Sequence, residues 1–134
     1  MCLYTKQSEG FITKEDIVCY KIMSKKFFGA RARFRNFRYW RYIKYKTNID
    51  FLRFNHINCI EAGFHSYQKL EIAKRSLNFK TIGLHIYECI IPKGSIVFKG
   101  NDIFNRTYDD NFLSVDDTMQ YVSNQIIIKK RVIE

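Results

Sequence analysis

The residues best suited to chemistry lie in the segment 21–46, which holds ten lysines and arginines and no acidic residue. Aromatic side chains are interleaved with these charges, and the only tryptophan of the chain, Trp40, stands between Arg38 and Arg41. Guanidinium and ammonium groups bind phosphates and exposed aromatic rings stack on unpaired bases, so this mixture predicts a surface for RNA or single-stranded DNA. We call 21–46 the basic aromatic segment. The residues expected to contact nucleic acid are Arg31, Arg33, Arg35, Arg38, Trp40, Arg41, Lys44 and Lys46.

The charge of this segment sets it apart from the rest of the chain. The 134 residues include 23 Lys and Arg against 13 Asp and Glu, a net charge of +10, which the segment alone accounts for. Such a charge favours anionic partners. Five aspartates and one arginine lie in 101–119, which we interpret as an acidic loop that can cover part of the basic face. In the alternative interpretation, the basic residues line a solvated strand face and the aromatic rings point inward.

Several histidines and cysteines are of the types that bind zinc. His56, Cys59 and His65 lie within ten residues of one another, and His85 and Cys89 supply two further candidates. Zinc sites usually contain closely spaced ligand pairs such as CxxC, which this chain lacks, and residues four apart on a strand share a face but lie too far apart for one ion. We therefore predict buried thiols and hydrogen-bonded imidazoles, and no metal.

The cysteine pattern and the hydropathy indicate in which cellular compartment we expect the protein. Four cysteines are dispersed along the chain, no export signal precedes them, and no stretch of 18 apolar residues occurs. Disulfide-stabilised domains are exported and usually richer in cysteine. We expect reduced, mostly buried thiols, no disulfide, no membrane association and a cytoplasmic protein. The four residues are Cys2, Cys19, Cys59 and Cys89.

One group of residues has the types found in ADP-ribosyltransferase-like sites, where a histidine and a tyrosine hold a nicotinamide cofactor and a glutamate orients the acceptor. Here these would be His65 and Tyr67, beside Ser66, with Glu88 later in the chain. The spacing is not diagnostic, and the glycine that usually follows that family's histidine is absent. The interpretation we favour is a turn in which Ser66 caps a helix. We accordingly predict no catalytic residue and no cofactor.

The elements that must position these residues alternate between strands and one helix. Apolar positions 70, 73 and 77 have helical spacing, which predicts one main helix at about 66–78. The segment 34–46 fits a strand or a hairpin arm, and 47–62 fits a loop with a short element inside it. This order predicts an α+β fold with a mostly antiparallel sheet, in a single domain over 1–134. The clearest predicted strands are 16–23, 84–91, 95–99 and 121–130, with a turn at 92–94 and a break at 100–101.

Five short stretches together resemble a family of small uncharacterised proteins of Bacteroides-type bacteria and their phages. The resemblance covers most of the chain and is loosest at 23–61 and 100–119. It implies a bacterial or phage setting, in the host cytoplasm or in a virion, and it implies no activity, cofactor or catalytic residue. The stretches are MCLYT at 1–5, DIVCYKI at 16–22, AGFHSY at 62–67, YECIIPKGS at 87–95 and YVSNQIII at 121–128.

These observations favour a small basic binding module over an enzyme. Its expected partner is RNA or single-stranded DNA, contacted by the basic aromatic segment through phosphate contacts and stacking. The alternative is a protein-interaction module, such as a phage accessory or structural component or an inhibitor of a host protein, that uses the same face against an acidic protein surface. A small ADP-ribosyltransferase-like enzyme is the further alternative.

Overall fold

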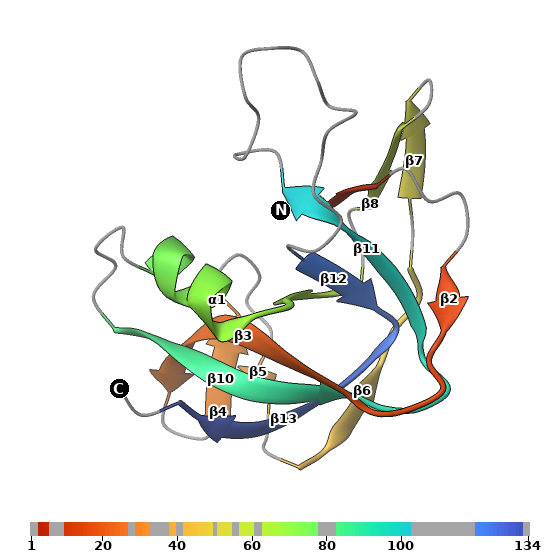
Figure 1. Ribbon diagram of the computed structural model, residues 1–134. Coiled ribbons are helices and arrows are strands. Elements are labelled where there is room, and N and C mark those ends of the chain that lie inside the picture. The colour runs from red at the N-terminus through yellow and green to blue at the C-terminus, as the bar shows by residue number, and fades with distance from the viewer. Residues whose placement is uncertain are drawn as a thin grey trace.

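The computed structural model describes residues 3–5, 10–26, 29–32, 38–39, 42–49, 51–54, 57–60, 63–77, 83–102 and 120–132. Within these residues the chain forms a sheet, in which every pairing is antiparallel, and one helix (Figure 1). The strands are β1 (Leu3–Thr5), β2 (Phe11–Ile12), β3 (Ile17–Lys26), β4 (Gly29–Ala32), β5 (Arg38–Tyr39), β6 (Lys44–Lys46), β7 (Phe51–Phe54), β8 (Ile57–Ile60), β9 (Phe64–Tyr67), β10 (Leu84–Ile91), β11 (Ile96–Asp102), β12 (Gln120–Ser123) and β13 (Gln125–Arg131), and the helix is α1 (Leu70–Leu77).

Three long stretches of chain, 11–26, 84–102 and 120–131, lie side by side and each is divided into two strands. In the middle stretch, β10 pairs with β3 and β13, and β11 continues the ladder with β2 and β12. The short strand β9 pairs with β12 on one side and with β3 on the other. The pairing thus returns to its starting strand, and the sheet encloses an interior.

The middle stretch turns between its two strands at 92–95. Gly94 adopts a φ of 86°, which a glycine tolerates without strain. Thr13 fastens this turn to the first stretch: its hydroxyl donates to the Pro92 carbonyl (3.0 Å) and accepts from the Ser95 N–H (3.0 Å). Its carbonyl accepts the Gly94 N–H (2.9 Å). Because these groups are buried or nearly so, the turn is held by polar contacts that water does not replace.

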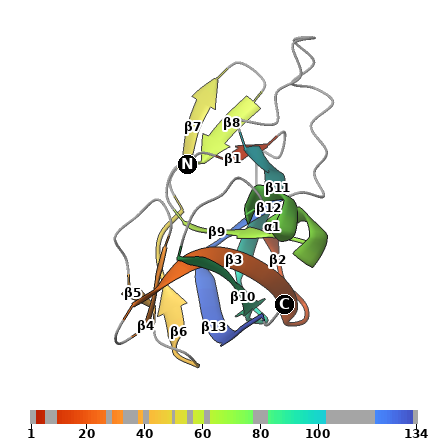
Figure 2. The same ribbon diagram turned by 90° about the vertical axis from the view of Figure 1, so that its left-hand side faces the viewer.

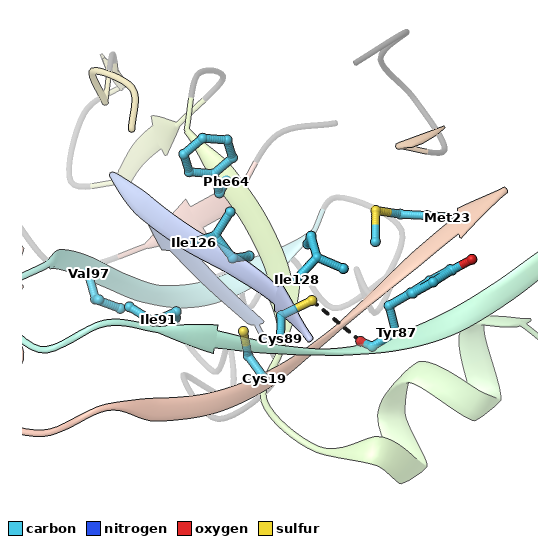
Figure 3. Close-up of a cluster of buried hydrophobic side chains, with 9 residues drawn as sticks. All are labelled: Cys19, Met23, Phe64, Tyr87, Cys89, Ile91, Val97, Ile126 and Ile128. Atoms are coloured by element: carbon cyan, nitrogen blue, oxygen red, sulfur yellow. Dashed lines mark hydrogen bonds between the residues drawn. The ribbon is translucent and has the colours of Figure 1, made fainter. Parts of the chain in front are cut away.

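The interior of the folded sheet is filled by side chains from five strands (Figure 3). Successive side chains of a strand point to opposite faces, so alternate residues of β3, β10 and β13 enter this core and their neighbours point outward. We call the face that points away from this core the outer face. The core residues are Cys19, Met23, Phe64, Tyr87, Cys89, Ile91, Val97, Ile126 and Ile128.

The outer face is covered in two places. Helix α1 packs its Ile72 and Ala73 against Ile22 and Ile86, which are the outward neighbours of core residues on β3 and β10. Elsewhere a third cluster joins Ile60 of β8 to strands β11 and β12. Figure 2 shows β7 and β8 as a hairpin at the end of the molecule far from β4 and β6. Among the described residues, no helix has the length and apolarity needed to cross a membrane.

The mostly antiparallel sheet confirms the predicted sheet class, but the prediction of a main helix at about 66–78 overstates the helix. The helix α1 begins only at Leu70, because Ser66 and Tyr67 belong to β9 and pair with Tyr121 and Gln120 of β12. Ser66 is therefore not a helix cap. Eight helical residues against an extensive sheet place the fold between α+β and mainly β.

Other predicted elements have mixed outcomes. The strand at 84–91 is confirmed with its exact bounds, and that at 16–23 is confirmed but extends to Lys26. The predicted break at 100–101 is wrong, since β11 continues to Asp102 by pairing with β1, so 101–102 are not part of an acidic loop. The segment 47–62, predicted as a loop with a short element inside it, contains two short strands that form the β7–β8 hairpin. The rest of the predicted acidic loop, 103–119, lies outside the described residues.

Candidate nucleic-acid interface

The structure describes four of the eight residues expected to contact nucleic acid. Arg31 of β4 and Arg38 of β5 are direct partners across an antiparallel pair, which brings their backbone positions together. Lys44 and Lys46 lie on another strand, β6. In Figure 2 β4, β5 and β6 lie together on the side of the molecule opposite α1. The other four, Arg33, Arg35, Trp40 and Arg41, lie outside the described residues.

Strand β6 presents its lysines to solvent because its central residue is used by the core. Tyr45 packs against the core and pairs with Ile126 of β13, whose side chain is buried. Lys44 and Lys46, one residue to either side of Tyr45, consequently point to the outer face, and both are exposed. The alternative interpretation therefore holds at this strand, since the aromatic ring of Tyr45 points inward and Lys44 and Lys46 line a solvated face.

Tyr42 is the most exposed of the large hydrophobic side chains described, at 71% of its full area. Its φ of 61° lies in the left-handed region, which costs a bulky residue about 1–2 kcal/mol. The Tyr42 N–H donates to the carbonyl of Ile128 on β13 (2.8 Å), which helps to hold the backbone in place. A strained backbone under an exposed aromatic ring is the kind of feature that often accompanies a functional surface.

The outer face beside Lys44 carries a row of apolar side chains that ends in that lysine. Val18, Ile90 and Ile127 are register partners on β3, β10 and β13, and Ile127 is in turn the partner of Lys44. Each of the three apolar residues is a neighbour of core residues and therefore points outward. None of them is buried, and Val18 keeps 48% of its area exposed.

The next row on the same face is polar. Tyr20 and Lys130 are the register partners of Glu88 on either side, and Lys129 Nζ lies 3.9 Å from Glu88 Oε2. Burial, and after it the charge of Glu88, raises the pKa of Tyr20, so its phenol stays neutral and can donate a hydrogen bond. Lys130 is exposed. We give the name outer-face platform to Val18, Tyr20, Lys44, Lys46, Ile90, Ile127 and Lys130, together with the exposed Tyr42 that precedes β6 in the chain.

The first basic residue of the basic aromatic segment does not belong to this platform. Lys21 points into the interior, where its ammonium donates to the backbone carbonyl of His65 on β9 (2.5 Å). It is buried, and burial lowers its pKa below the ordinary value. Of the charge assigned to the segment, this lysine is therefore unavailable to a ligand.

Lys21 lies in an unusual polar environment within the core, together with Cys19 and Cys89. Burial raises the pKa of Cys19, but the neighbouring Cys89 and Ser66 side chains and the charge of Lys21 outweigh it, and the net effect is a lowered pKa. For Cys89, burial and then the interaction with Cys19 raise the pKa well above its ordinary value. The two thiols thus differ in how readily they ionise.

The other candidate chemistries are not brought together. No group of three or more His, Cys, Asp or Glu in the described part of the chain could hold a metal ion. His56 lies outside that part. Tyr67 is buried against the α1 cluster, and strand β3 lies between it and Glu88, since Tyr20 is the register partner of both. The residues of the predicted enzyme site thus lie on two strands, β9 and β10, with β3 between them.

Sequence reasoning missed the contribution of β13 to the platform. The sequence predicts one strand at 121–130, whereas the structure has β12 and β13 here, and Ile127, the middle residue of an isoleucine triplet, points outward between two buried neighbours. Period-two alternation within the triplet was the signal that could have shown this.

A comparison with protein-family models, curated proteins and solved structures finds no match to this chain.

Proposed function

We propose that this protein binds single-stranded nucleic acid, RNA or single-stranded DNA, through the outer-face platform together with the arginines of the basic aromatic segment. The observation that supports the proposal most is Tyr42, an exposed aromatic ring on a strained backbone that is followed two residues later by the exposed Lys44. Ring and ammonium are the two groups that an unpaired nucleotide uses, one for its base and one for its phosphate.

The platform suits an unpaired strand better than a duplex. Strand β6 gives phosphate contacts at Lys44 and Lys46, and the row formed by Val18, Ile90 and Ile127 offers an apolar surface against which bases can pack. In duplexes the base faces are hidden by stacking, so such a surface has nothing to contact. Base stacking on an aromatic side chain contributes about 1–3 kcal/mol per base.

The proposal is tested by fluorescence anisotropy with labelled single-stranded RNA, single-stranded DNA and duplex DNA over a range of salt concentrations. We compare Lys44→Ala/Lys46→Ala with a control that removes the same charge, Lys74→Ala/Arg75→Ala in the last turn of α1. Loss of two phosphate contacts should weaken binding to every single strand alike and reduce the slope of log K against log salt by about 1.4. The control should bind as the wild type does.

A second pair of variants tests the arginines and the tryptophan at 35–41, of which the structure describes Arg38. Arg35→Ala/Arg38→Ala/Arg41→Ala should lower affinity and flatten the salt dependence further, and Trp40→Ala should reduce affinity for single strands more than for duplex. Wild-type affinity in the triple arginine variant and in the double lysine variant would contradict the proposal.

A protein partner with an acidic surface is the competing outcome of the same work. If no nucleic acid binds at low salt, and a pulldown from host extract yields one protein in stoichiometric amount after nuclease treatment, the basic face serves protein interaction instead. Binding of a nicotinamide cofactor would point to the enzyme alternative.

A further inference from the structure

Cys19 and Cys89 face each other in the middle of the longest ladder of the sheet. They are register partners on β3 and β10, both side chains point into the core, and both are fully buried as free thiols (Figure 3). No residue separates them along the ladder, because each is the direct register partner of the other. The Cys89 thiol also reaches the Tyr87 carbonyl (3.5 Å).

Register partners in an antiparallel pair have Cα atoms about 4.5–5.5 Å apart, and cysteines joined by a disulfide have Cα atoms about 4.4–6.8 Å apart. A bond between these sulfurs therefore requires side-chain rotation and little movement of the backbone. The Cβ atoms of ladder partners, at about 4.5–5.5 Å, are however wider apart than the roughly 3.8 Å typical of a disulfide. The bond would draw the strands together, and this strain would make it easy to reduce.

We propose that Cys19 and Cys89 are an oxidation site at which a hydroperoxide converts the two thiols into a reversible disulfide between β3 and β10. The inference stands on the register of these strands and does not depend on nucleic-acid binding.

The reaction balances with the peroxide as the only oxidant. The Cys19 thiolate attacks one peroxide oxygen, the O–O bond breaks, and hydroxide leaves and takes a proton to become water, which leaves a sulfenic acid on Cys19. The Cys89 sulfur then attacks the Cys19 sulfur, the S–O bond breaks, and the second hydroxide takes the Cys89 proton. Two thiols and one hydrogen peroxide thus give one disulfide and two waters.

The assignment of roles follows from the surroundings of each sulfur. Burial raises the pKa of Cys19, but the neighbouring Cys89 and Ser66 side chains and the charge of the Lys21 ammonium lower it on balance, so its thiolate is favoured and it attacks first. Cys89 remains a thiol and resolves the sulfenic acid. Lys21 is a positioning residue. Its hydrogen bond to the His65 carbonyl holds the ammonium in place, and its charge acts on the reaction only through the Cys19 thiolate.

The test uses the full chain with Cys2→Ser and Cys59→Ser, which leaves only the pair in question. After treatment with hydrogen peroxide, the protein is denatured, alkylated and weighed by mass spectrometry. We expect a monomer that has lost two hydrogen atoms, takes up no alkylating agent, and regains both thiols on treatment with dithiothreitol. Three results would each overturn the proposal: alkylation of both thiols after peroxide treatment, a disulfide between two chains, or sulfinic acid on one cysteine in place of the disulfide.

Single variants then separate the two roles. With Cys89→Ala the Cys19 sulfenic acid cannot be resolved, so the sulfenic-acid reagent dimedone should label Cys19, whereas Cys19→Ala should give no label at Cys89. Circular dichroism and a thermal melt establish that each variant is folded. In Lys21→Met the midpoint of the oxidation rate against pH should move upward, with about a tenfold slower rate at neutral pH for each unit of that movement. Equal labelling at both cysteines, or an unmoved midpoint, would contradict the assigned roles.

Discussion

The ammonium of Lys21 donates a hydrogen bond to the backbone carbonyl of His65, and this contact joins β3 to β9 inside the protein. The two strands have a single described register pair, Tyr20 with Tyr67, so the lysine adds a second link at the point where the sheet closes. Lys21 thus has a structural role inside the protein. The other lysines of the basic aromatic segment whose side chains are described, Lys44 and Lys46, are exposed.

The first prediction concerns the pH dependence of stability. Burial holds the pKa of Lys21 below its ordinary value of 10.5, so between the lowered pKa and 10.5 the unfolded chain binds a proton that the folded chain does not. The free energy of unfolding from this group must therefore rise with pH across that window. In Lys21→Met this rise should be lost, which urea denaturation at several pH values between 7 and 10 would measure.

The cysteines do not obscure this comparison. Cys19 and Cys89 also titrate differently in the folded and unfolded states, but both remain in the variant. Loss of the lysine charge weakens the lowering of the Cys19 pKa, which changes the pH dependence in the same direction. Parallel curves for wild type and Lys21→Met would show that the lysine keeps an ordinary pKa in the folded protein.

The second prediction separates the ring of Tyr42 from its backbone. In Tyr42→Gly the positive φ of 61° no longer meets a Cβ, so the folded protein should be as stable as the wild type or up to about 1 kcal/mol more stable. Its affinity for single strands should fall because the ring is absent. In Tyr42→Ala affinity should fall equally without the gain in stability, as measured by urea denaturation and anisotropy on the same samples.

An equal affinity of wild type, Tyr42→Gly and Tyr42→Ala for single-stranded RNA and DNA would remove Tyr42 from the proposed interface. Tyr42→Phe serves as the matched variant, since it keeps the ring and the backbone strain and loses only the hydroxyl. It should bind as the wild type does.

Much of the sheet could be predicted because local sequence and burial agree there. The run at 84–91 is apolar at most positions, which predicts a buried strand, and it forms β10, with Ile86 covered by α1 and Ile90 left on the outer face. The helix was overextended because Ser66 satisfies the local signal for a cap, whereas its backbone pairs with Tyr121 of a strand more than fifty residues later in the chain. Such long-range pairing leaves no mark on a local pattern.

The candidate site was predictable only in part for a similar reason. Charge can be counted from the sequence, so Lys44 and Lys46 were identified, but their face depends on Tyr45 pairing with Ile126. Lys21 looks like any other basic residue of the segment, and only the fold shows that it points inward. The opposition of Cys19 and Cys89 likewise follows from a register that spans seventy residues of chain.

The third prediction tests the alternation of faces on β13. Ile126 and Ile128 are fully buried, so Ile126→Ala or Ile128→Ala should cost about 2–5 kcal/mol of unfolding free energy. Ile127 lies between them on the outer face, and Ile127→Ala should cost clearly less while it weakens binding of single strands. Denaturation and anisotropy measure the two effects. A larger stability loss at Ile127 than at its neighbours would mean that the register of β13 is shifted by one residue.

The fourth prediction compares two glycines with positive φ. Gly63 precedes β9 with a φ of 131°, and a Cβ there would collide with Val122 Cγ1, part of a buried cluster with Ile60. Gly83 precedes β10 with a φ of 83°, and a Cβ there would meet no atom within 4 Å. Gly83→Ala should therefore cost only the conformational penalty, about 1–2 kcal/mol.

Gly63→Ala adds the collision to that penalty, and because Val122 is itself fully buried it cannot move away freely. Overpacking of this kind costs about 1–3 kcal/mol more, so the thermal midpoint of Gly63→Ala should lie well below that of Gly83→Ala. Equal midpoints would mean that β9 approaches β12 less closely than their pairing of His65 with Val122 requires.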